Sequence, residues 1–141
     1  YMPIQTEIDI SPVILRIRAL ERIVCLPVIV ARNEPLNFKV WSNHTKLVKG
    51  QFNVLEPLTG GIVEPDLILC PMLSFDSIGY RLGYGGGFYD RTIAYLNKKK
   101  KVFALGCAYS EQLSLERLPC GQHDKPLNAV ATENGLTHFN S

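Results

Sequence analysis

One segment, residues 66 to 106, constrains the fold more than any other. It opens with Asp66-Leu-Ile-Leu-Cys-Pro71, a nearly all-apolar run stopped by proline, which is the pattern of a buried parallel strand. A glycine-rich stretch follows, then Phe88 to Leu96 with the periodicity of a helix, and then the apolar run Val102 to Gly106. Strand, helix and strand in this order predict a right-handed parallel crossover, and therefore an α/β fold.

The stretch between the first strand and the helix predicts an anion site. Glycines can take positive φ without steric cost and leave backbone N–H groups uncovered, and the positive end of the following helix adds to this preference. No Lys-Ser or Lys-Thr follows, and Phe88 stands where a dinucleotide fingerprint has its third glycine. We expect a phosphate here, with a purely structural tight loop as the alternative. The glycines are Gly83, Gly85, Gly86 and Gly87.

The rest of the chain predicts one further long helix and several strands. Ser11-Pro12 is typical of a helix start, with Ser11 as N-cap and about ten helical residues after it. Pro27 interrupts a β-branched run and predicts an edge strand or a bulge, because proline cannot donate to the ladder. Strands are expected over residues 23–30, 36–41 and 127–132, loop over 43–65 and a short helix over 111–117.

Composition limits the class of protein. The 141 residues suit one domain, residues 1–141, around a single core. A net charge of +2 with 20% charged residues does not call for a nucleic-acid partner. No apolar run reaches the length of about 18 residues that a membrane span needs. The four cysteines contain no Cys-x-x-Cys pair and predict structural thiols, so we expect a cytoplasmic protein. We also expect a monomer.

Several segments resemble one known family. Pro71 to Asp76, Gly79 to Arg91 and His123 to Glu133 are similar, in sequence and in order, to segments of the 5-formyltetrahydrofolate cyclo-ligases, also called methenyltetrahydrofolate synthetases. Tyr1 to Glu7, and Trp41 followed by Phe52 to Pro57, resemble other segments of that family, so the likeness covers nearly the whole chain.

The resemblance implies a three-layer α/β/α fold with a mostly parallel central sheet. It also implies an ATP- and Mg²⁺-dependent ring closure of 5-formyltetrahydrofolate to 5,10-methenyltetrahydrofolate, with release of ADP and phosphate. In the family scheme the formyl oxygen attacks the γ-phosphate, the folate's own N10 closes the ring and phosphate leaves. An enzyme nucleophile is then not required, and the protein must align the reactants and neutralise charge.

Carried over position by position, the resemblance implies individual site residues. Arg81 and Tyr89 would be catalytic, and Asp90 with Asn128 would bind Mg²⁺. The nucleotide would contact Arg81, Gly83, Tyr84, Gly85, Gly86, Gly87, Phe88 and Tyr89, and the folate would contact Glu7, Met2 and Tyr84. The residues alone leave alternatives open: Arg81 could pair with Asp76, Asp90 could be a first-turn helix charge, and Glu7 could be a surface carboxylate.

Two departures from the family pattern motivate a different class of function. The family usually begins with a helical segment whose Lys and Arg reach the ATP phosphates, and this sequence starts at Tyr1, so we expect N-terminal truncation relative to the family. Asn128 stands where a metal-binding aspartate is common, and a neutral ligand should hold Mg²⁺ less firmly. A non-catalytic domain that binds nucleotide or folate is the alternative. A sugar-phosphate isomerase or lyase on a related scaffold is a weaker third reading.

Overall fold

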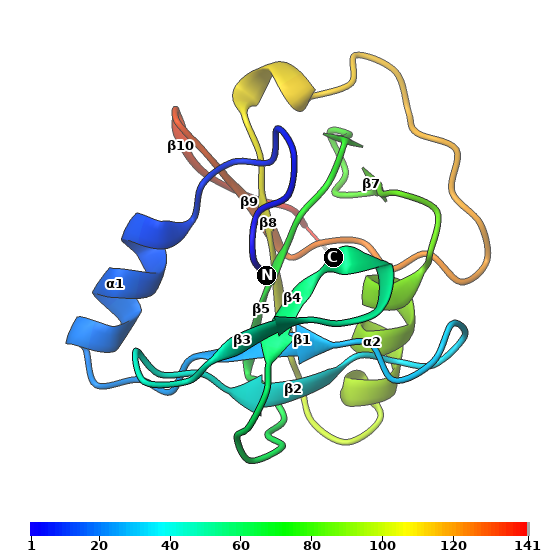
Figure 1. Cartoon of the computed structure of the whole chain (residues 1–141). Coiled ribbons are helices and arrows are strands. Elements are labelled where there is room, and N and C mark those ends of the chain that lie inside the picture. Colours follow the sequence, from blue (N-terminus) through cyan, green and yellow to red (C-terminus); the bar gives the residue numbers. More distant parts are fainter. Residues whose placement is uncertain (141) are drawn as a thin grey trace.

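The computed structural model describes residues 1–140, and a four-stranded sheet lies at its centre (Figure 1). The strand order is β10-β9-β8-β5, in which β5 with β8 and β8 with β9 are parallel, and β9 with β10 is antiparallel. The predicted α/β class and mostly parallel central sheet are therefore confirmed. The strands are β5 (Leu67–Cys70), β8 (Phe103–Cys107), β9 (Ala129–Thr132) and β10 (Gly135–His138).

Two α-helices within residues 1–140, α1 (Ser11–Ala19) and α2 (Phe88–Asn97), lie on opposite sides of this sheet (Figure 1). Successive side chains of a strand point to opposite faces, so β5 contributes to two separate clusters. Leu69 packs with the cluster that contains Ile14 of α1. The other face of β5 and the buried side of α2 share the larger cluster, which includes Ile68, Cys70, Ile93 and Leu96. The three layers follow from this alternation.

Three antiparallel pairs of short strands complete the part of the chain that the structure describes. Pro27 lies opposite Phe38 in the β1–β2 pair, a two-stranded sheet in which each strand is an edge, so the predicted edge position is confirmed. The pairs are β1 (Cys25–Val28) with β2 (Asn37–Val40), β3 (Leu47–Lys49) with β4 (Leu55–Pro57), and β6 (Ser74–Phe75) with β7 (Arg81–Leu82).

Three local expectations were wrong. Residues 43–65 are not all loop, because they contain the β3–β4 pair joined by a 3₁₀ turn, η1 (Gln51–Asn53). Each of the two strands has only three residues, which is too few to show an alternating pattern in the sequence. Residues 111–117 form no α-helix; the only helical residues there belong to the 3₁₀ turn η2 (Ser110–Gln112). The Ser114 N–H donates to the Phe75 carbonyl and not to a carbonyl of the preceding turn, so the helix does not continue. Ile10, not Ser11, is the N-cap of α1.

Thr92 connects α2 to the strand layer and carries the first testable prediction. Its side chain is fully buried, accepts a hydrogen bond from the Leu36 N–H at 2.9 Å and donates to the Phe88 carbonyl at 2.6 Å. Thr92→Val keeps the shape but leaves the buried Leu36 N–H without its partner, which costs about 1–3 kcal/mol of unfolding free energy. Urea unfolding measures this loss. Thr92→Ser keeps both hydrogen bonds, and an equal loss in the two variants would contradict the explanation.

Candidate active site

A cavity of about 610 Å³ lies between the N-terminal segment, the β3–β4 pair and the glycine loop of residues 83–87. Its wall contains Met2, Glu7 and Tyr84, the three residues predicted to contact folate. The same wall contains residues predicted to contact the nucleotide, namely Gly85, Gly86, Phe88 and Tyr89. The structure thus brings together two predicted groups that lie about eighty positions apart in sequence.

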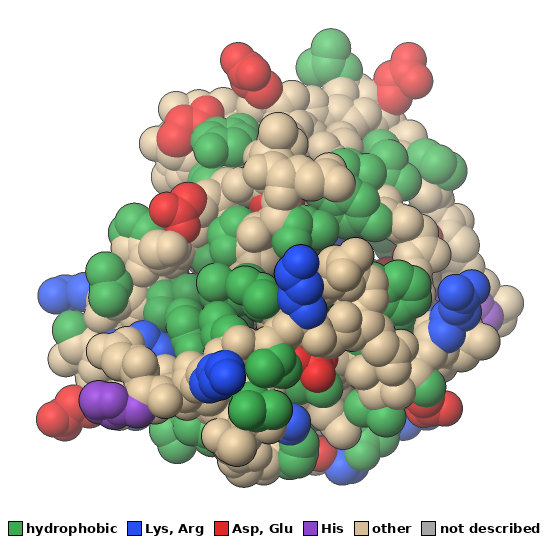
Figure 2. Space-filling model, viewed as in Figure 1, with side chains coloured by type: hydrophobic (Ala, Val, Ile, Leu, Met, Phe, Trp, Pro, Cys, Tyr) green, Lys and Arg blue, Asp and Glu red, His purple; other side chains and the backbone are tan. Residues whose placement is uncertain are grey.

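A second cavity, of about 710 Å³, lies between α1 and β5. Figure 2 shows hydrophobic side chains gathered on this face between α1 and the strands at its centre. Tyr89 is the one predicted site residue on the wall of this second cavity, and it also lines the first. Apart from Tyr89, the larger cavity therefore lacks the residues predicted to bind reactants.

Glu7 is held at the first cavity by the backbone and by the glycine loop. Its Oε2 accepts a hydrogen bond from the Ile4 N–H at 2.8 Å. Burial raises the pKa of the Glu7 carboxyl above its ordinary value, and hydrogen bonds from the Ile4 N–H and the Tyr84 hydroxyl oppose that rise. Glu7 and Tyr84 both line the cavity, so the N-terminal segment and the glycine loop meet at its wall.

The glycine loop ends at α2 in a way that leaves backbone donors available. Gly87 is the N-cap of α2 with φ 65°, and no side chain caps this end of the helix. The first N–H groups of a helix have no partners within the helix, so an anion can accept from them. Gly85 also has positive φ, 89°, and a Cβ there would meet no atom within 4 Å. The loop is open on the side where a ligand would approach.

The backbone of Gly87 supports a second prediction. Positive φ strains any L side chain, and a Cβ at this position would lie 2.7 Å from Nη1 of Arg91. We expect Gly87→Ala to lower the free energy of unfolding by about 1–2 kcal/mol, measured by urea denaturation. Gly83 is the matched control in the same loop, because its φ is not positive and a Cβ there would meet nothing within 4 Å. Equal stability of both variants would show that the loop relaxes freely.

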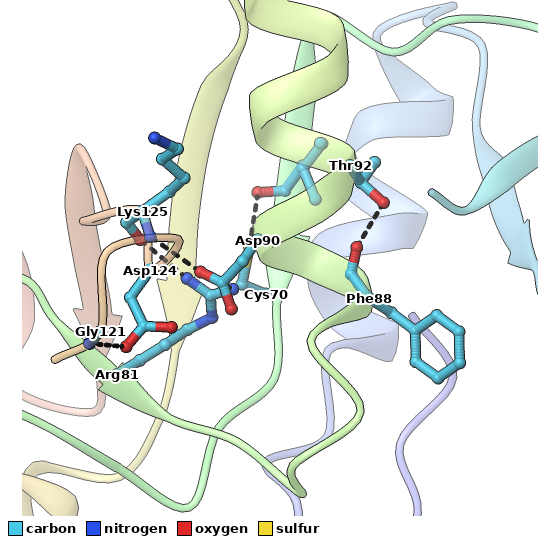
Figure 3. A network of polar contacts seen from close by, with 9 residues as sticks. Cys70, Arg81, Phe88, Asp90, Thr92, Gly121, Asp124 and Lys125 are labelled. Carbon is cyan, nitrogen blue, oxygen red and sulfur yellow. Dashed lines mark hydrogen bonds and ion pairs between the residues drawn. The ribbon is translucent and has the colours of Figure 1, made fainter. Parts of the chain in front are cut away.

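Beside the loop, Arg81 of β7 and Asp90 in the first turn of α2 form a partly buried ion pair (Figure 3). The Arg81 side chain is 5% exposed, and its Nη2 lies 3.1 Å from Asp90 Oδ1. Lys125 completes the cluster: its N–H donates to Asp90 Oδ1 at 2.9 Å, and its carbonyl accepts from Arg81 Nη1 at 3.0 Å. Arg81 does not pair with Asp76, whose Oδ1 accepts from the backbone N–H groups of Ile78 and Tyr80.

Asn128 lies in a different setting from Asp90. Its Oδ1 accepts a hydrogen bond from the Ala104 N–H at 2.7 Å, and its own N–H donates to the Ala104 carbonyl at 2.9 Å, so Asn128 is attached to the amino-terminal part of β8. No hydrogen bond or ion pair joins it to Asp90 within residues 1–140. The same residues contain no group of three or more His, Cys, Asp or Glu side chains that could hold a metal. The metal role of Asn128 stays a prediction.

Several polar and aromatic residues on the cavity wall were not identified from sequence as site residues. Phe52 lies on the cavity wall with its side chain 56% exposed, and its ring packs edge-to-face against Phe88 at 6.1 Å. Glu56 adds a second carboxylate to the cavity wall that contains Glu7. Arg32 and Asn33 come from the turn between β1 and β2. The segment from Phe52 to Pro57 resembled the family, which was the one available signal.

The cysteines contribute no nucleophile to the site. All four are free, with Cys70 and Cys107 buried, Cys25 half-buried and Cys120 exposed. Burial raises the pKa of the Cys70 thiol to about 12 and that of Cys107 to about 11. Both stay protonated at neutral pH, which agrees with structural thiols.

Among the described residues, no helix has the length and apolar character needed to cross a membrane.

An α/β sheet with a glycine loop at a helix N-terminus, beside a cavity that contains a carboxylate, defines an α/β protein with a small-molecule site. Comparison with known proteins makes this specific. Residues 1–133 match the model of the 5-formyltetrahydrofolate cyclo-ligase family. The chain belongs to this family.

Individual relatives agree with this assignment. A 5-formyltetrahydrofolate cyclo-ligase of Escherichia coli K12 is 35% identical over 140 residues, covering 94% of this chain and 75% of that protein. The Mycolicibacterium smegmatis cyclo-ligase is 32% identical over 142 residues, covering 94% and 71% respectively. The solved structure of Aquifex aeolicus 5,10-methenyltetrahydrofolate synthetase is 31% identical with a TM-score of 0.74, covering 99% of this chain and 69% of that one.

Proposed function

We propose that this protein catalyses the ATP- and Mg²⁺-dependent cyclisation of 5-formyltetrahydrofolate to 5,10-methenyltetrahydrofolate, with release of ADP and phosphate. One observation carries the proposal: Glu7 and the glycine loop line the same cavity of about 610 Å³. The reaction needs the formyl group of one reactant beside the γ-phosphate of the other. A single cavity with a carboxylate on one wall and unpaired helix amides on another meets that need.

The folate end of the cavity is assigned to Glu7. A carboxylate can accept paired N–H donors, as it does from a guanidinium, and the pterin ring offers such a pair. The Ile4 N–H holds the carboxylate in place, and Tyr84 and Met2 supply neighbouring surface for the ring. These residues bind and orient the substrate, which is the main task when the substrate's own N10 closes the ring.

The phosphate end is assigned to the glycine loop and α2. The uncapped N-terminus of α2 favours negative charge, and the open side of Gly83 and Gly85 admits a group close to the backbone. Arg81 adds a cation next to this loop, in the ion pair with Asp90. These groups would stabilise the charge that develops on the transferred phosphoryl group.

Asp90 fits a role as the Mg²⁺ ligand. Its Oδ1 is engaged by Arg81 and Lys125, whereas its Oδ2 accepts no hydrogen bond among the described residues. Mg²⁺ is usually held by one or two carboxylates together with substrate phosphates, so one carboxylate oxygen at this position is sufficient. When bound, Mg²⁺ supplies positive charge that offsets the phosphate oxygens. Asn128 is proposed as a weaker, second ligand.

Tyr89 is proposed to act as a hydrogen-bond donor to the reactants. Burial raises the pKa of its hydroxyl well above the ordinary value, so the phenol stays protonated at neutral pH. No hydrogen bond from this hydroxyl to another group is formed within residues 1–140. A neutral donor on the wall of the reaction cavity can stabilise negative charge as it develops on oxygen.

The remaining expectations are proposals as well. We propose that residues 1–141 act as a single-domain, cytoplasmic monomer without nucleic-acid or membrane partners. The two hydrophobic clusters share one central sheet, which supports a single domain. Size-exclusion chromatography with light scattering would test the monomer, since a dimer would elute with twice the mass of 15.8 kDa.

A specific observation favours a second candidate function, a non-catalytic domain that binds nucleotide or folate. Arg81 and Asp90 neutralise each other in the ion pair, and Asn128 is attached to β8, so few charges face a phosphate freely. Such a site could bind the reactants without supporting transfer. The two candidates differ in turnover, not in binding.

Turnover therefore decides between them. The protein is mixed with Mg-ATP and 5-formyltetrahydrofolate, and the near-ultraviolet absorbance of the conjugated methenyl product is followed together with ADP release. We expect both signals to rise in equal amounts. Binding of Mg-ATP without either signal would favour the non-catalytic domain. Omission of ATP is the control for non-enzymatic ring closure.

A further inference from the structure

The turn of residues 31–34, between β1 and β2, contributes the cation of the reaction cavity. Among the residues that line the 610 Å³ cavity, Arg32 is the one lysine or arginine, whereas Glu7 and Glu56 supply two carboxylates. Both reactants of the proposed function are anionic. An acidic wall with a single guanidinium makes that guanidinium important for binding them.

Arg91 of α2 attaches this turn to the glycine loop. Its Nη2 donates to the Gly86 carbonyl at 2.7 Å and to the Arg32 carbonyl at 3.0 Å, and its Nε donates to the Glu34 carbonyl at 3.3 Å. A hydrogen bond from the Glu34 N–H to the Ala31 carbonyl closes the turn itself. The backbone of Arg32 is therefore held at a defined place beside the proposed phosphate loop.

The Arg32 side chain remains available to a ligand. The residue is exposed, and its guanidinium carbon lies 5.9 Å from the centre of the Phe52 ring at the edge of the cavity. No carboxylate lies within ion-pair distance of it in residues 1–140, where the ion pairs involve Arg81, Lys99 and Lys100. A guanidinium in cation–π contact with a ring keeps the N–H groups in its own plane free, so it can still donate to an anion.

We propose that Arg32 binds an oxyanion of a reactant in this cavity. The inference rests on the proposed function, whose reactants carry two kinds of oxyanion: the phosphates of ATP and the glutamate carboxylates of the folate tail. The planar guanidinium binds both kinds through two parallel N–H···O bonds. Lysine keeps the charge but not this geometry, so Arg32→Lys should restore only part of what Arg32→Ala loses.

The test measures KM for ATP and KM for 5-formyltetrahydrofolate with one or several glutamates in the wild type, Arg32→Ala and Arg32→Lys. We expect Arg32→Ala to raise one of these KM values by about 10- to 100-fold, as for a lost charged hydrogen bond, with little change in kcat. A rise for ATP alone identifies the phosphates. A rise for folate that grows with the number of glutamates identifies the carboxylate tail.

Arg16→Ala is the matched control, because Arg16 is exposed on α1 and its removal changes the net charge equally. KM values of Arg32→Ala that equal those of Arg16→Ala would overturn the inference. Titration calorimetry with Mg-ATP and with 5-formyltetrahydrofolate gives the same comparison without turnover. A wild type that binds both but forms no product rejects the proposed function only, and the Kd values still test Arg32.

Discussion

Asp90→Asn is expected to lower the rate of methenyl product formation by about 100-fold or more, the size of effect seen when one charged group that stabilises a transition state is removed. Asp90 lies in the first turn of α2, directly after the glycine loop, and its Oδ2 accepts no hydrogen bond among the described residues. The neutral amide retains an acceptor for the Lys125 N–H but loses the negative charge that holds a metal and faces Arg81.

The same substitution should leave the chain folded but less stable. Arg81, with a side chain only 5% exposed, would lose its ionic partner, which costs about 1–3 kcal/mol of unfolding free energy. Asp66→Asn is the matched control: Asp66 pairs with Lys100, and its side chain is 92% exposed. We expect that variant to change stability by less than about 0.5 kcal/mol and to keep full activity. Unchanged turnover in Asp90→Asn would mean that the metal is held elsewhere.

Substitution of Glu7 is expected to weaken folate binding while the affinity for Mg-ATP stays the same. Glu7→Ala removes the carboxylate assigned to the pterin ring, and the loss of charged hydrogen bonds raises Kd by about 10- to 100-fold. Titration calorimetry with each reactant separates the two affinities. If the affinity for ATP fell instead, the assignment of the two ends of the cavity would be reversed.

Glu7→Gln should also change how stability depends on pH. Because burial raises the Glu7 pKa, the folded state disfavours the charged carboxylate. The contribution of Glu7 to stability is then largest below its ordinary value of 4.5 and is lost as pH rises through the raised folded pKa. We therefore expect Glu7→Gln to melt at a higher temperature than the wild type at pH 7, and the difference to shrink at pH 4.

Exposed Glu111 provides the control for that measurement. Glu111→Gln removes the same charge from the surface and should leave the difference in melting temperature near zero at both pH values. Greater stability together with weaker folate binding in Glu7→Gln would indicate a carboxylate retained for binding. Equal melting curves for Glu7→Gln and wild type would show that Glu7 carries no cost in the folded protein.

The sequence was sufficient where local pattern and local physics agree. The apolar runs at β5 and β8, the helix after Gly87 and the edge position of Pro27 were all predicted, because burial on both faces, helical periodicity and a missing N–H act on the residues that show them. The order of these elements determined the parallel pairing of β5 with β8. Motif likeness along nearly the whole chain was enough to identify the family.

Tertiary structure decided what depends on residues far apart in the chain. The β3–β4 pair exists because its two short strands bond to each other, and neither shows a pattern alone. Sequence could not indicate that Arg81 pairs with Asp90 instead of Asp76, or that Asn128 is bonded to β8, because partners are chosen by distance in space. Residue types and local elements are properties of the sequence, whereas the cavity, its single cation Arg32 and its partnerships arise only when the packed chain brings distant groups together.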